Sequence, residues 1–339
     1  MRKEFTMDTT PNCIARQISN GIINGAVVLA GTVEKDLFSG AYGFADRENN
    51  VLMSPASVFD IASVTKVIGT TNALLTAIEA GKIELDRPFT DYIPKFRTVM
   101  RETVTVRMLA THISGISMAY PQISPAEVMR DAFLDITFPE KPGIIFQYTC
   151  TAFILLGLII ENVMGETLDK IVSEKVFQKL GMSDTRWTQP PVGAQERTIR
   201  TINAAPGIIS DPGARAFFPQ ALGNAGIFST ASDLAKYCRM MLKNDGSIFA
   251  PEVLNLCFKN CNPPEIKHAR SIGWDMEEHG IPGGLSPQTV YHSGWTGQTV
   301  WVDPVKKCFV IVLTNRCGDW TKARDGRINI AEEILTEIH

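Results

Sequence analysis

The chain has 339 residues, of which 45% are hydrophobic, and its net charge at pH 7 is −3. This length and composition are enough for a large buried core and, we expect, two subdomains. The sequence contains no long run of one charge sign. It therefore lacks the basic surface that a nucleic-acid or anionic-membrane partner would need.

The two chain ends are rich in strand patterns, and the middle is rich in helical ones. Near the N-terminus, we expect two short strands and then a helix that closes at Gly81. Further helices should follow, then strands again, and a terminal helix. The expected strands are 25–31, 37–42, 271–276, 299–302 and 308–314, and the expected helices are 67–80, 106–112, 125–133, 151–164, 168–180, 231–243 and 327–338.

This order predicts a discontinuous α/β domain of the α+β type. Residues 1–81 and 266–339 would build its antiparallel sheet, and residues 82–265 would form an inserted, mainly helical domain. The longest apolar run, 152–160, is too short to span a membrane, which takes about 20 residues. The first residues lack the apolar segment of a secretory signal. We therefore expect a soluble, cytoplasmic protein, or a periplasmic or secreted one if a signal peptide has been removed.

The seven cysteines are scattered and odd in number, which favours reduced thiols over a disulfide framework. Cys257 and Cys261 are four residues apart, but no second pair or nearby histidine completes a zinc set. We expect neither a metal nor a cofactor. The oligomeric state is left open.

The residues Ser63-Val64-Thr65-Lys66 open the first predicted helix. A serine and a lysine three residues apart lie on one face of a helix. A serine needs a base within hydrogen-bond reach to become a nucleophile, and a desolvated lysine can serve as that base. The pattern S-x-x-K is therefore a candidate nucleophile motif.

Two downstream segments support it. Tyr148 precedes an apolar run, and His292-Ser293-Gly294-Trp295 precedes two predicted strands. In this order and at these separations, the chain resembles the class C β-lactamase-like serine hydrolases. That family includes esterases, D-amino-acid peptidases, penicillin-binding proteins and β-lactamases, and it carries S-x-x-K, Y-x-N and K-T-G or H-x-G. The resemblance covers nearly the whole chain and implies the β-lactamase/penicillin-binding-protein fold, with the active site between the two domains.

The resemblance implies an acyl-enzyme mechanism on an ester or amide substrate. Ser63 would be the nucleophile, and Lys66 and Tyr148 would move protons, with the choice of base left open. His292 would take part in the site by hydrogen bonding or proton transfer. The backbone N–H groups of Ser63 and Trp295 would hold the oxyanion.

Cys150, Ser293 and Gly294 are the candidate substrate-binding residues. Glycine fits position 294 because a side chain there would crowd an acyl group that lies along the strand edge. His112 is interpreted as a packing residue.

The sequence departs from the family pattern at two positions. Cys150 replaces the asparagine of Y-x-N, and a thiol is a poor substitute for an amide as a hydrogen-bond partner. His292 replaces the lysine of K-T-G, which removes a permanent positive charge. Both changes favour esters or uncharged amides over β-lactams and D-Ala-D-Ala peptides.

Three alternatives are open. Cys150 could be a thiol nucleophile, although its sequence neighbours offer no cation to activate it. Ser117, in a partial G-x-S-x-G pattern, could be the nucleophile of an α/β-hydrolase. The chain could also be a binding or regulatory module that keeps the fold and has lost efficient turnover.

Overall fold

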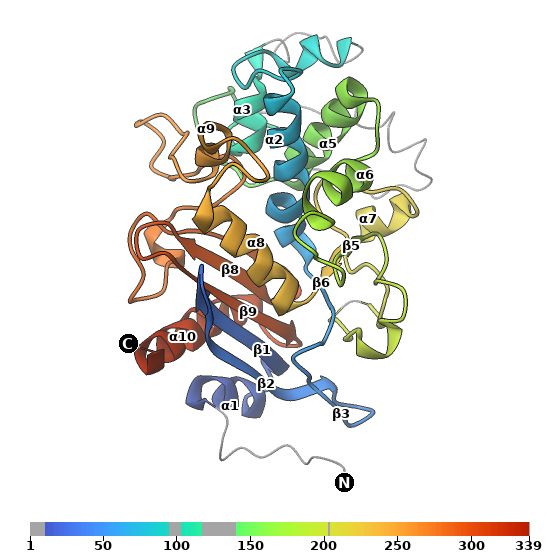
Figure 1. Ribbon diagram of the computed structural model, residues 1–339, viewed down its shortest axis with the longest axis vertical. Helices are drawn as coiled ribbons and strands as arrows, with labels where there is room; N and C mark the ends of the chain where they lie inside the picture. Colours follow the sequence, from blue (N-terminus) through green and yellow to red (C-terminus); the bar gives the residue numbers. More distant parts are fainter. Residues whose placement is uncertain (1–10, 95–102, 117–139, 203, 339) are drawn as a thin grey trace.

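The computed structural model describes residues 11–94, 103–116, 140–202 and 204–338. Its main layer is a six-stranded antiparallel sheet in the order β3-β2-β1-β9-β8-β7 (Figure 1). Strands from both ends of the sequence meet at its centre, where β1 pairs with β9. The strands are β1 (Ile23–Thr32), β2 (Asp36–Asp46), β3 (Val51–Leu52), β7 (Val290–Gly294), β8 (Gln298–Asp303) and β9 (Cys308–Arg316).

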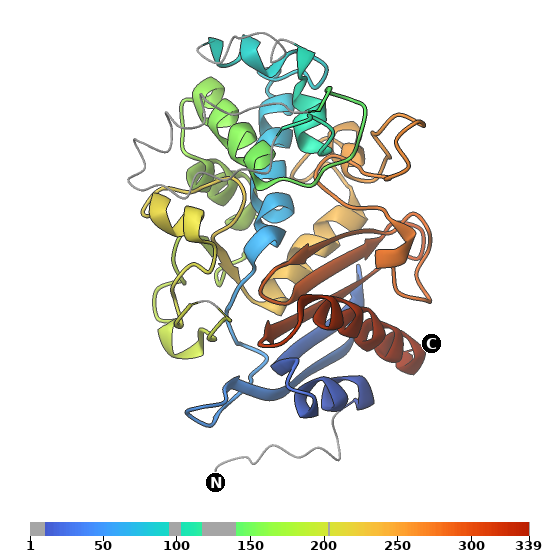
Figure 2. The same cartoon turned by 180° about the vertical axis from the view of Figure 1, so that it is seen from behind.

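Helices cover both faces of this sheet. Helix α8 (Ala231–Lys243) lies on the face seen in Figure 1, and α1 (Asn12–Ser19) and α10 (Trp320–Ile338) lie on the opposite face, seen in Figure 2. Because both faces are covered, the central strand β9 is buried along its whole length. Its near-continuous apolar sequence fits that position.

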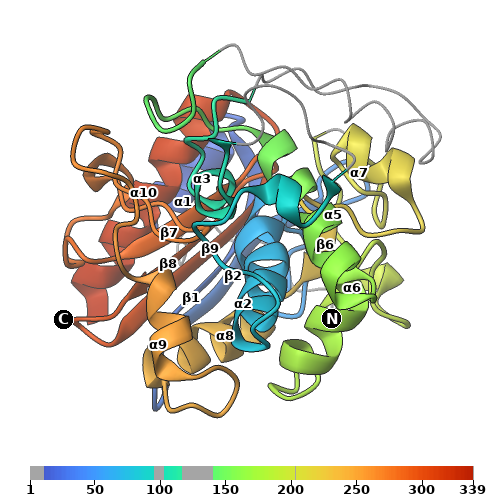
Figure 3. The same cartoon turned by 90° about the horizontal axis from the view of Figure 1, so that it is seen from above.

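The other part of the described chain is mainly helical and lies beyond one end of the sheet (Figure 3). Helix α5, which is apolar around most of its circumference and largely buried, is at its core. A small sheet of order β4-β6-β5 runs between the two parts. These elements are α2 (Thr71–Glu79), α3 (Val106–Ala110), α5 (Cys150–Met164), α6 (Leu168–Val172), α7 (Pro212–Phe217), α9 (Pro251–Leu254), β4 (Phe59–Asp60), β5 (Arg186–Trp187) and β6 (Ile227–Ser229).

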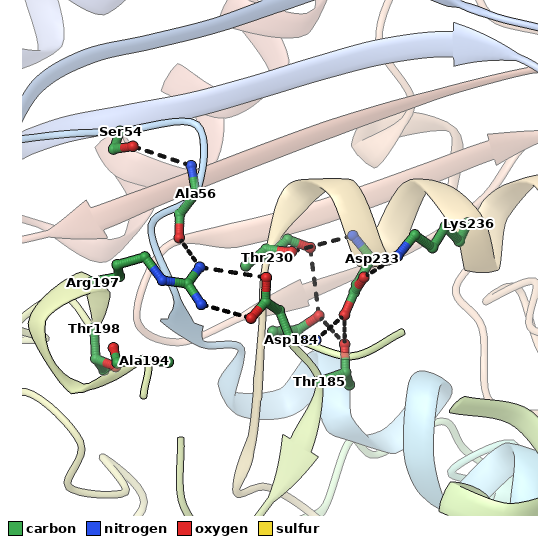
Figure 4. Close-up of polar contacts among 11 residues, drawn as sticks. Ser54, Ala56, Asp184, Thr185, Ala194, Arg197, Thr198, Thr230, Asp233 and Lys236 are labelled. Carbon is green, nitrogen blue, oxygen red and sulfur yellow. Dashed lines mark hydrogen bonds and ion pairs between the residues drawn. The ribbon is translucent and has the colours of Figure 1, made fainter. Parts of the chain in front are cut away.

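A polar network fixes the chain as it leaves the large sheet for β4 (Figure 4). Arg197 donates to the carbonyl oxygen of Ala56 at 2.8 Å and pairs with Asp184 at 2.6 Å. The buried Asp233 in α8 accepts from the Asp184 N–H at 2.7 Å and from the Thr185 hydroxyl at 2.9 Å. The network therefore joins three segments that are far apart in the sequence.

Most predicted elements are confirmed, including the strands in both terminal segments and helix α8. The strand predicted at 271–276 is wrong, because Arg270 and Asp275 form only isolated bridges there. The terminal helix begins at Trp320, seven residues before the predicted start at 327. The predicted helix 125–133 lies outside the described residues, and the two-domain division stays a prediction.

In the described chain no single helix is long and apolar enough to cross a membrane. One pair bent by 78°, α5 followed by Leu168–Phe177, meets the criteria of length and composition only.

Candidate active site

Ser63 lies on a single 3₁₀ turn, Ala62–Val64, directly after strand β4. A π-helical turn, Lys66–Thr70, follows and leads into α2. The prediction that Ser63 and Lys66 share one face is confirmed, since Lys66 Nζ lies 3.1 Å from Ser63 Oγ. The predicted helix over 67–80 is thus α-helical only from Thr71, and π-turns of this kind are frequent at functional sites.

Lys66 is completely buried and donates to three acceptors. These are Ser63 Oγ at 3.1 Å, Cys150 Sγ at 3.4 Å and the carbonyl oxygen of Asn224 at 2.9 Å. An ammonium group has three donors, so this set fits the protonated form. Burial acts to lower the pKa of Lys66, but Cys150 and Tyr148 outweigh it and raise the pKa above its ordinary value. Lys66 is therefore a cation in the resting site.

Tyr148 lies beside Lys66, whose Nζ is 5.2 Å from the centre of the tyrosine ring. The buried His112 packs against this ring at 4.5 Å. Its backbone carbonyl accepts from the Gln147 N–H at 2.8 Å, and its Nδ1 accepts from the Thr149 N–H at 3.3 Å. Burial, and then Arg270, hold the pKa of His112 well below its ordinary value. His112, predicted to be a packing residue, thus holds the backbone on both sides of Tyr148 as a neutral ring.

Cys150 is the first residue of α5 and is partly exposed. The sequence neighbours of this thiol offer no cation, but the fold brings Lys66 Nζ to 3.4 Å from its sulfur. The two residues are 84 positions apart, so local sequence could not show the contact. Ser117, the other alternative nucleophile, lies outside the described residues.

His292 lies in β7, and its ring centre is 6.2 Å from that of Tyr148. Its Nδ1 is 3.1 Å from the carbonyl oxygen of Ser293 and therefore carries a hydrogen, which it donates. Burial, followed by the charges of Arg270 and Lys66, lowers the pKa of His292 well below 6.5. The ring is a neutral hydrogen-bonding group.

Gly294 ends β7 where that strand meets the turn of Ser63. A Cβ atom built at position 294 would lie 2.6 Å from the Ile61 carbonyl oxygen and 2.6 Å from Gln298 Oε1. The predicted reason for glycine, space for an acyl group, is therefore incomplete, because the protein's own backbone occupies that space. The close approach brings the backbone at Trp295 beside the backbone at Ser63.

A crevice of about 390 Å³ opens over Ser63, Tyr148, His292 and Ser293. Its walls are largely aromatic. Trp295, whose side chain is 49% exposed, stacks on Trp320 at 5.3 Å between ring centres. The C-terminal helix α10 thus supplies part of the wall. Most of the site residues predicted from the sequence line this crevice, and Lys66 connects Cys150 to it by contacting both Ser63 and the thiol.

The sequence did not indicate a charged group in the crevice that comes from the segment before β7. Arg270 is buried there and donates to Asp275 at 2.9 Å and to the Gly273 carbonyl oxygen at 2.9 Å. Burial acts to raise the pKa of Asp275, but Arg270 and then His268 hold it well below its usual range. The crevice therefore contains a permanent cation, neutralised by its own carboxylate. Among the residues that the structure describes, no three histidine, cysteine or acidic side chains are placed to hold a metal ion.

This geometry agrees with comparisons against known proteins. A family model described as Beta-lactamase matches residues 12–333. The chain is 28% identical over 346 residues to Esterase EstB of Burkholderia gladioli, covering 86% of each sequence. It is 24% identical over 353 residues to an N-acetylmuramyl-L-alanine amidase of Bacillus subtilis, covering 89% of this chain and 79% of that one. A class C β-lactamase structure from Rhodobacter sphaeroides superposes with a TM-score of 0.76 at 20% identity, covering 96% and 98% of the two chains.

The fold and site define a serine hydrolase of the β-lactamase type, and the chain belongs to the Beta-lactamase family. Its sheet-and-helix architecture is the β-lactamase/penicillin-binding-protein fold, as the sequence predicted.

Proposed function

We propose that this hydrolase forms an acyl-enzyme on Ser63 and that its substrates are carboxylic esters or closely related amides. The observation that carries the proposal is the contact between Lys66 Nζ and Ser63 Oγ at the floor of an aromatic crevice. The similarity to an esterase and to an amidase supports the same class of reaction.

The charge state of Lys66 supports Tyr148 as the base. Because Lys66 is held as an ammonium group and cannot accept a proton, we assign the base to Tyr148, acting as a phenolate beside that cation. The phenolate takes the Ser63 proton while Oγ forms a bond to the acyl carbon. Tyr148 then gives the proton to the departing alcohol or amine as the bond to that leaving group breaks. A water molecule then attacks the acyl carbon while Tyr148 takes its proton. Tyr148 passes that proton to Ser63 Oγ as the bond from Oγ to the acyl carbon breaks, and the acid is released.

The oxyanion that forms during each attack needs preorganised donors. We assign this role to the backbone N–H groups of Ser63 and Trp295. The support is the close packing at Gly294, where the strand end before Trp295 touches the turn before Ser63.

Cys150 and His292 favour neutral substrates. The Cys150 thiol accepts from Lys66, and neutral His292 offers no charge to a carboxylate. A D-Ala-D-Ala peptidase or β-lactamase activity is the alternative, and the presence of Arg270 in the crevice favours it. Because Asp275 already pairs with Arg270, we place ester hydrolysis first. The third alternative is a binding or regulatory module without efficient turnover.

A fluorophosphonate probe tests the nucleophile. We expect one adduct, on the peptide that contains Ser63, and Ser63→Ala should abolish both the adduct and hydrolysis. An adduct on Cys150 or Ser117 that persists in Ser63→Ala would refute the mechanism. Absence of any adduct on the folded protein would favour the binding module.

The substrate class is tested by kcat/KM for p-nitrophenyl butyrate, a D-aminoacyl anilide and nitrocefin. We expect the ester to be the best of the three. Cys150→Asn should shift the ratio toward the amides, because it places a donor and an acceptor where the thiol offers little of either. Equal turnover of ester and nitrocefin by the wild type would refute the argument from Cys150 and His292.

A further inference from the structure

The residue before the nucleophile has an unusual backbone conformation. Ala62 has φ +45°, in the left-handed region that side chains other than glycine rarely adopt. Such residues persist only where the surroundings fix them, and they cluster at functional sites. The interactions that hold Ala62 in this conformation therefore bear directly on where Ser63 points.

The side chain of Asp60 provides such an interaction. Its Oδ1 accepts from the Ala62 N–H at 2.8 Å, a turn in which an aspartate bonds the backbone two residues on. Its Oδ2 accepts from the Ser210 N–H at 2.7 Å, so the same carboxylate also anchors the turn to a distant segment. Asp60 is only 1% exposed, and burial raises its pKa.

The backbone of Asp60 reaches the other half of the site. Its carbonyl oxygen lies 3.1 Å from the hydroxyl of Thr296, which shares its hydrogen with Gln298 Oε1 at 2.7 Å. Thr296 directly follows Trp295, the residue assigned to the oxyanion. Asp60 therefore contacts both backbone segments whose N–H groups are proposed to meet the oxyanion.

The bonds of Asp60 go to neutral donors and not to a cation. Among the residues that the structure describes, no lysine or arginine lies within ion-pair distance of its carboxylate, and a buried charge without a cation is costly. A neutral side chain could stabilise this turn at a lower desolvation free energy. The two backbone N–H donors here reach different oxygens, Oδ1 and Oδ2, so keeping both bonds requires an acceptor with two oxygens.

We propose that Asp60 is a positioning residue for the nucleophile. Its carboxylate holds Ala62 in the left-handed conformation and so sets the orientation of Ser63 toward Lys66 and toward the backbone at Trp295. This role rests on the proposed acyl-enzyme chemistry of Ser63.

The test is a cycle of three variants: Asp60→Asn, Ala62→Gly and the two combined. In Asp60→Asn, one oxygen becomes an NH₂ group that faces a backbone N–H, so one of the two bonds is lost. We expect kcat for p-nitrophenyl butyrate to fall by about 10²-fold, the scale of a small misplacement of reacting groups, with KM within about threefold. Glycine adopts a positive φ without strain, so it no longer needs the Asp60 bond.

The combined variant should therefore recover kcat to within about fivefold of Ala62→Gly alone. Asp233→Asn is the matched control, since Asp233 is also a buried aspartate that accepts from a backbone N–H, in the network away from Ser63 (Figure 4). It should lower Tm and leave kcat within about twofold of wild type. This separates general destabilisation from misplacement of the nucleophile.

Two results would overturn the proposal. One is a kcat for Asp60→Asn within threefold of wild type. The other is a loss of kcat in Asp60→Asn that Ala62→Gly does not relieve, which would show that Asp60 does not act through Ala62. Fluorophosphonate labelling of wild-type Ser63 is read first. A failure there counts against the proposed function itself, whereas normal labelling with either result above counts against the role of Asp60 alone.

Discussion

Replacing Lys66 with methionine separates what this residue does for catalysis from what it does for stability. Methionine is close to lysine in length and unbranched, so it fills the buried site without adding volume. It removes the ammonium group and with it the three bonds to Ser63 Oγ, Cys150 Sγ and the Asn224 carbonyl oxygen.

The expected loss of activity follows from the interactions that bear on the reaction. These are the bond to Ser63 Oγ and the charge beside Tyr148. A hydrogen bond to a charged group contributes about 1.5–3 kcal/mol, so two such interactions contribute about 3–6 kcal/mol. At about 1.4 kcal/mol per factor of ten, Lys66→Met should lower kcat/KM by about 10²–10⁴-fold.

Stability should change far less. Burying an ammonium group is costly, so an apolar replacement recovers that cost, while the Asn224 carbonyl oxygen loses its donor at a cost of about 1–3 kcal/mol. We expect the free energy of unfolding to stay within about 2 kcal/mol of wild type.

The assays are p-nitrophenyl butyrate hydrolysis, the rate of fluorophosphonate labelling and urea unfolding. Lys82→Met is the control, because Lys82 is an exposed lysine that follows α2 and donates to the Val163 carbonyl oxygen, away from Ser63. If Lys66→Met is folded and keeps more than a tenth of the wild-type kcat/KM, the assignment of Lys66 to the reaction is wrong.

Three further predictions concern Tyr148, His292 and Asp233. Tyr148→Phe keeps the ring contact with His112 and should stay folded while kcat falls by about 10²–10⁴-fold; unchanged kcat would limit Tyr148 to packing. The pKa of His292 is lowered in the folded state, so below about pH 6.5 the unfolded chain binds more protons and stability falls as the pH falls. Going from pH 7.5 to 5.5, His292→Gln should lose less stability than wild type in urea unfolding, by at most about 1.4 kcal/mol, and equal losses would contradict the neutral ring. Asp233→Asn weakens the bonds to the Asp184 N–H and the Thr185 hydroxyl and should lower the free energy of unfolding by about 1–3 kcal/mol. An unchanged free energy of unfolding would show that the network adds no stability.

The sequence predicted the candidate site residues because the chemistry of acyl transfer restricts which residue types can serve as nucleophile and base. The one-dimensional sequence already shows three of these features. They are a serine, a lysine three residues after it, and a tyrosine just before an apolar helix. Their meeting in one crevice follows from the fold that the same motifs implied.

Other parts of the site carry no such signal. The Asn224 carbonyl oxygen that accepts from Lys66 is a backbone atom and could come from any residue type. The contact of Lys66 with Cys150 depends on packing between the π-helical turn Lys66–Thr70 and α5, which local sequence does not encode. The 271–276 segment was mistaken for a strand because its apolar pattern is that of one. The buried pairing of Arg270 with Asp275 makes it fold back on itself instead.

One missed boundary did have a local signal. Helix α10 begins at Trp320 because the Asp319 side chain accepts from the Lys322 N–H at 2.9 Å. An aspartate directly before a helical pattern is a typical helix N-cap, so Asp319 predicts a helix that begins at residue 320. Trp320 would then have been placed on the first turn of the helix, at the end that borders the crevice.

The two departures from the family pattern, Cys150 and His292, have surroundings in the folded site that the sequence alone does not show. At position 150 the thiol remains a partner of Lys66, so we expect the change from an amide to weaken substrate recognition without isolating the ammonium group. At position 292 the neutral ring removes a charge, while Arg270 introduces one from another segment and Asp275 neutralises it. A substrate carboxylate would have to compete with Asp275 for that guanidinium. Restoring the family's asparagine alone should therefore improve amide binding more than it improves binding of a carboxylate, and a change at Asp275 would be needed to free the cation.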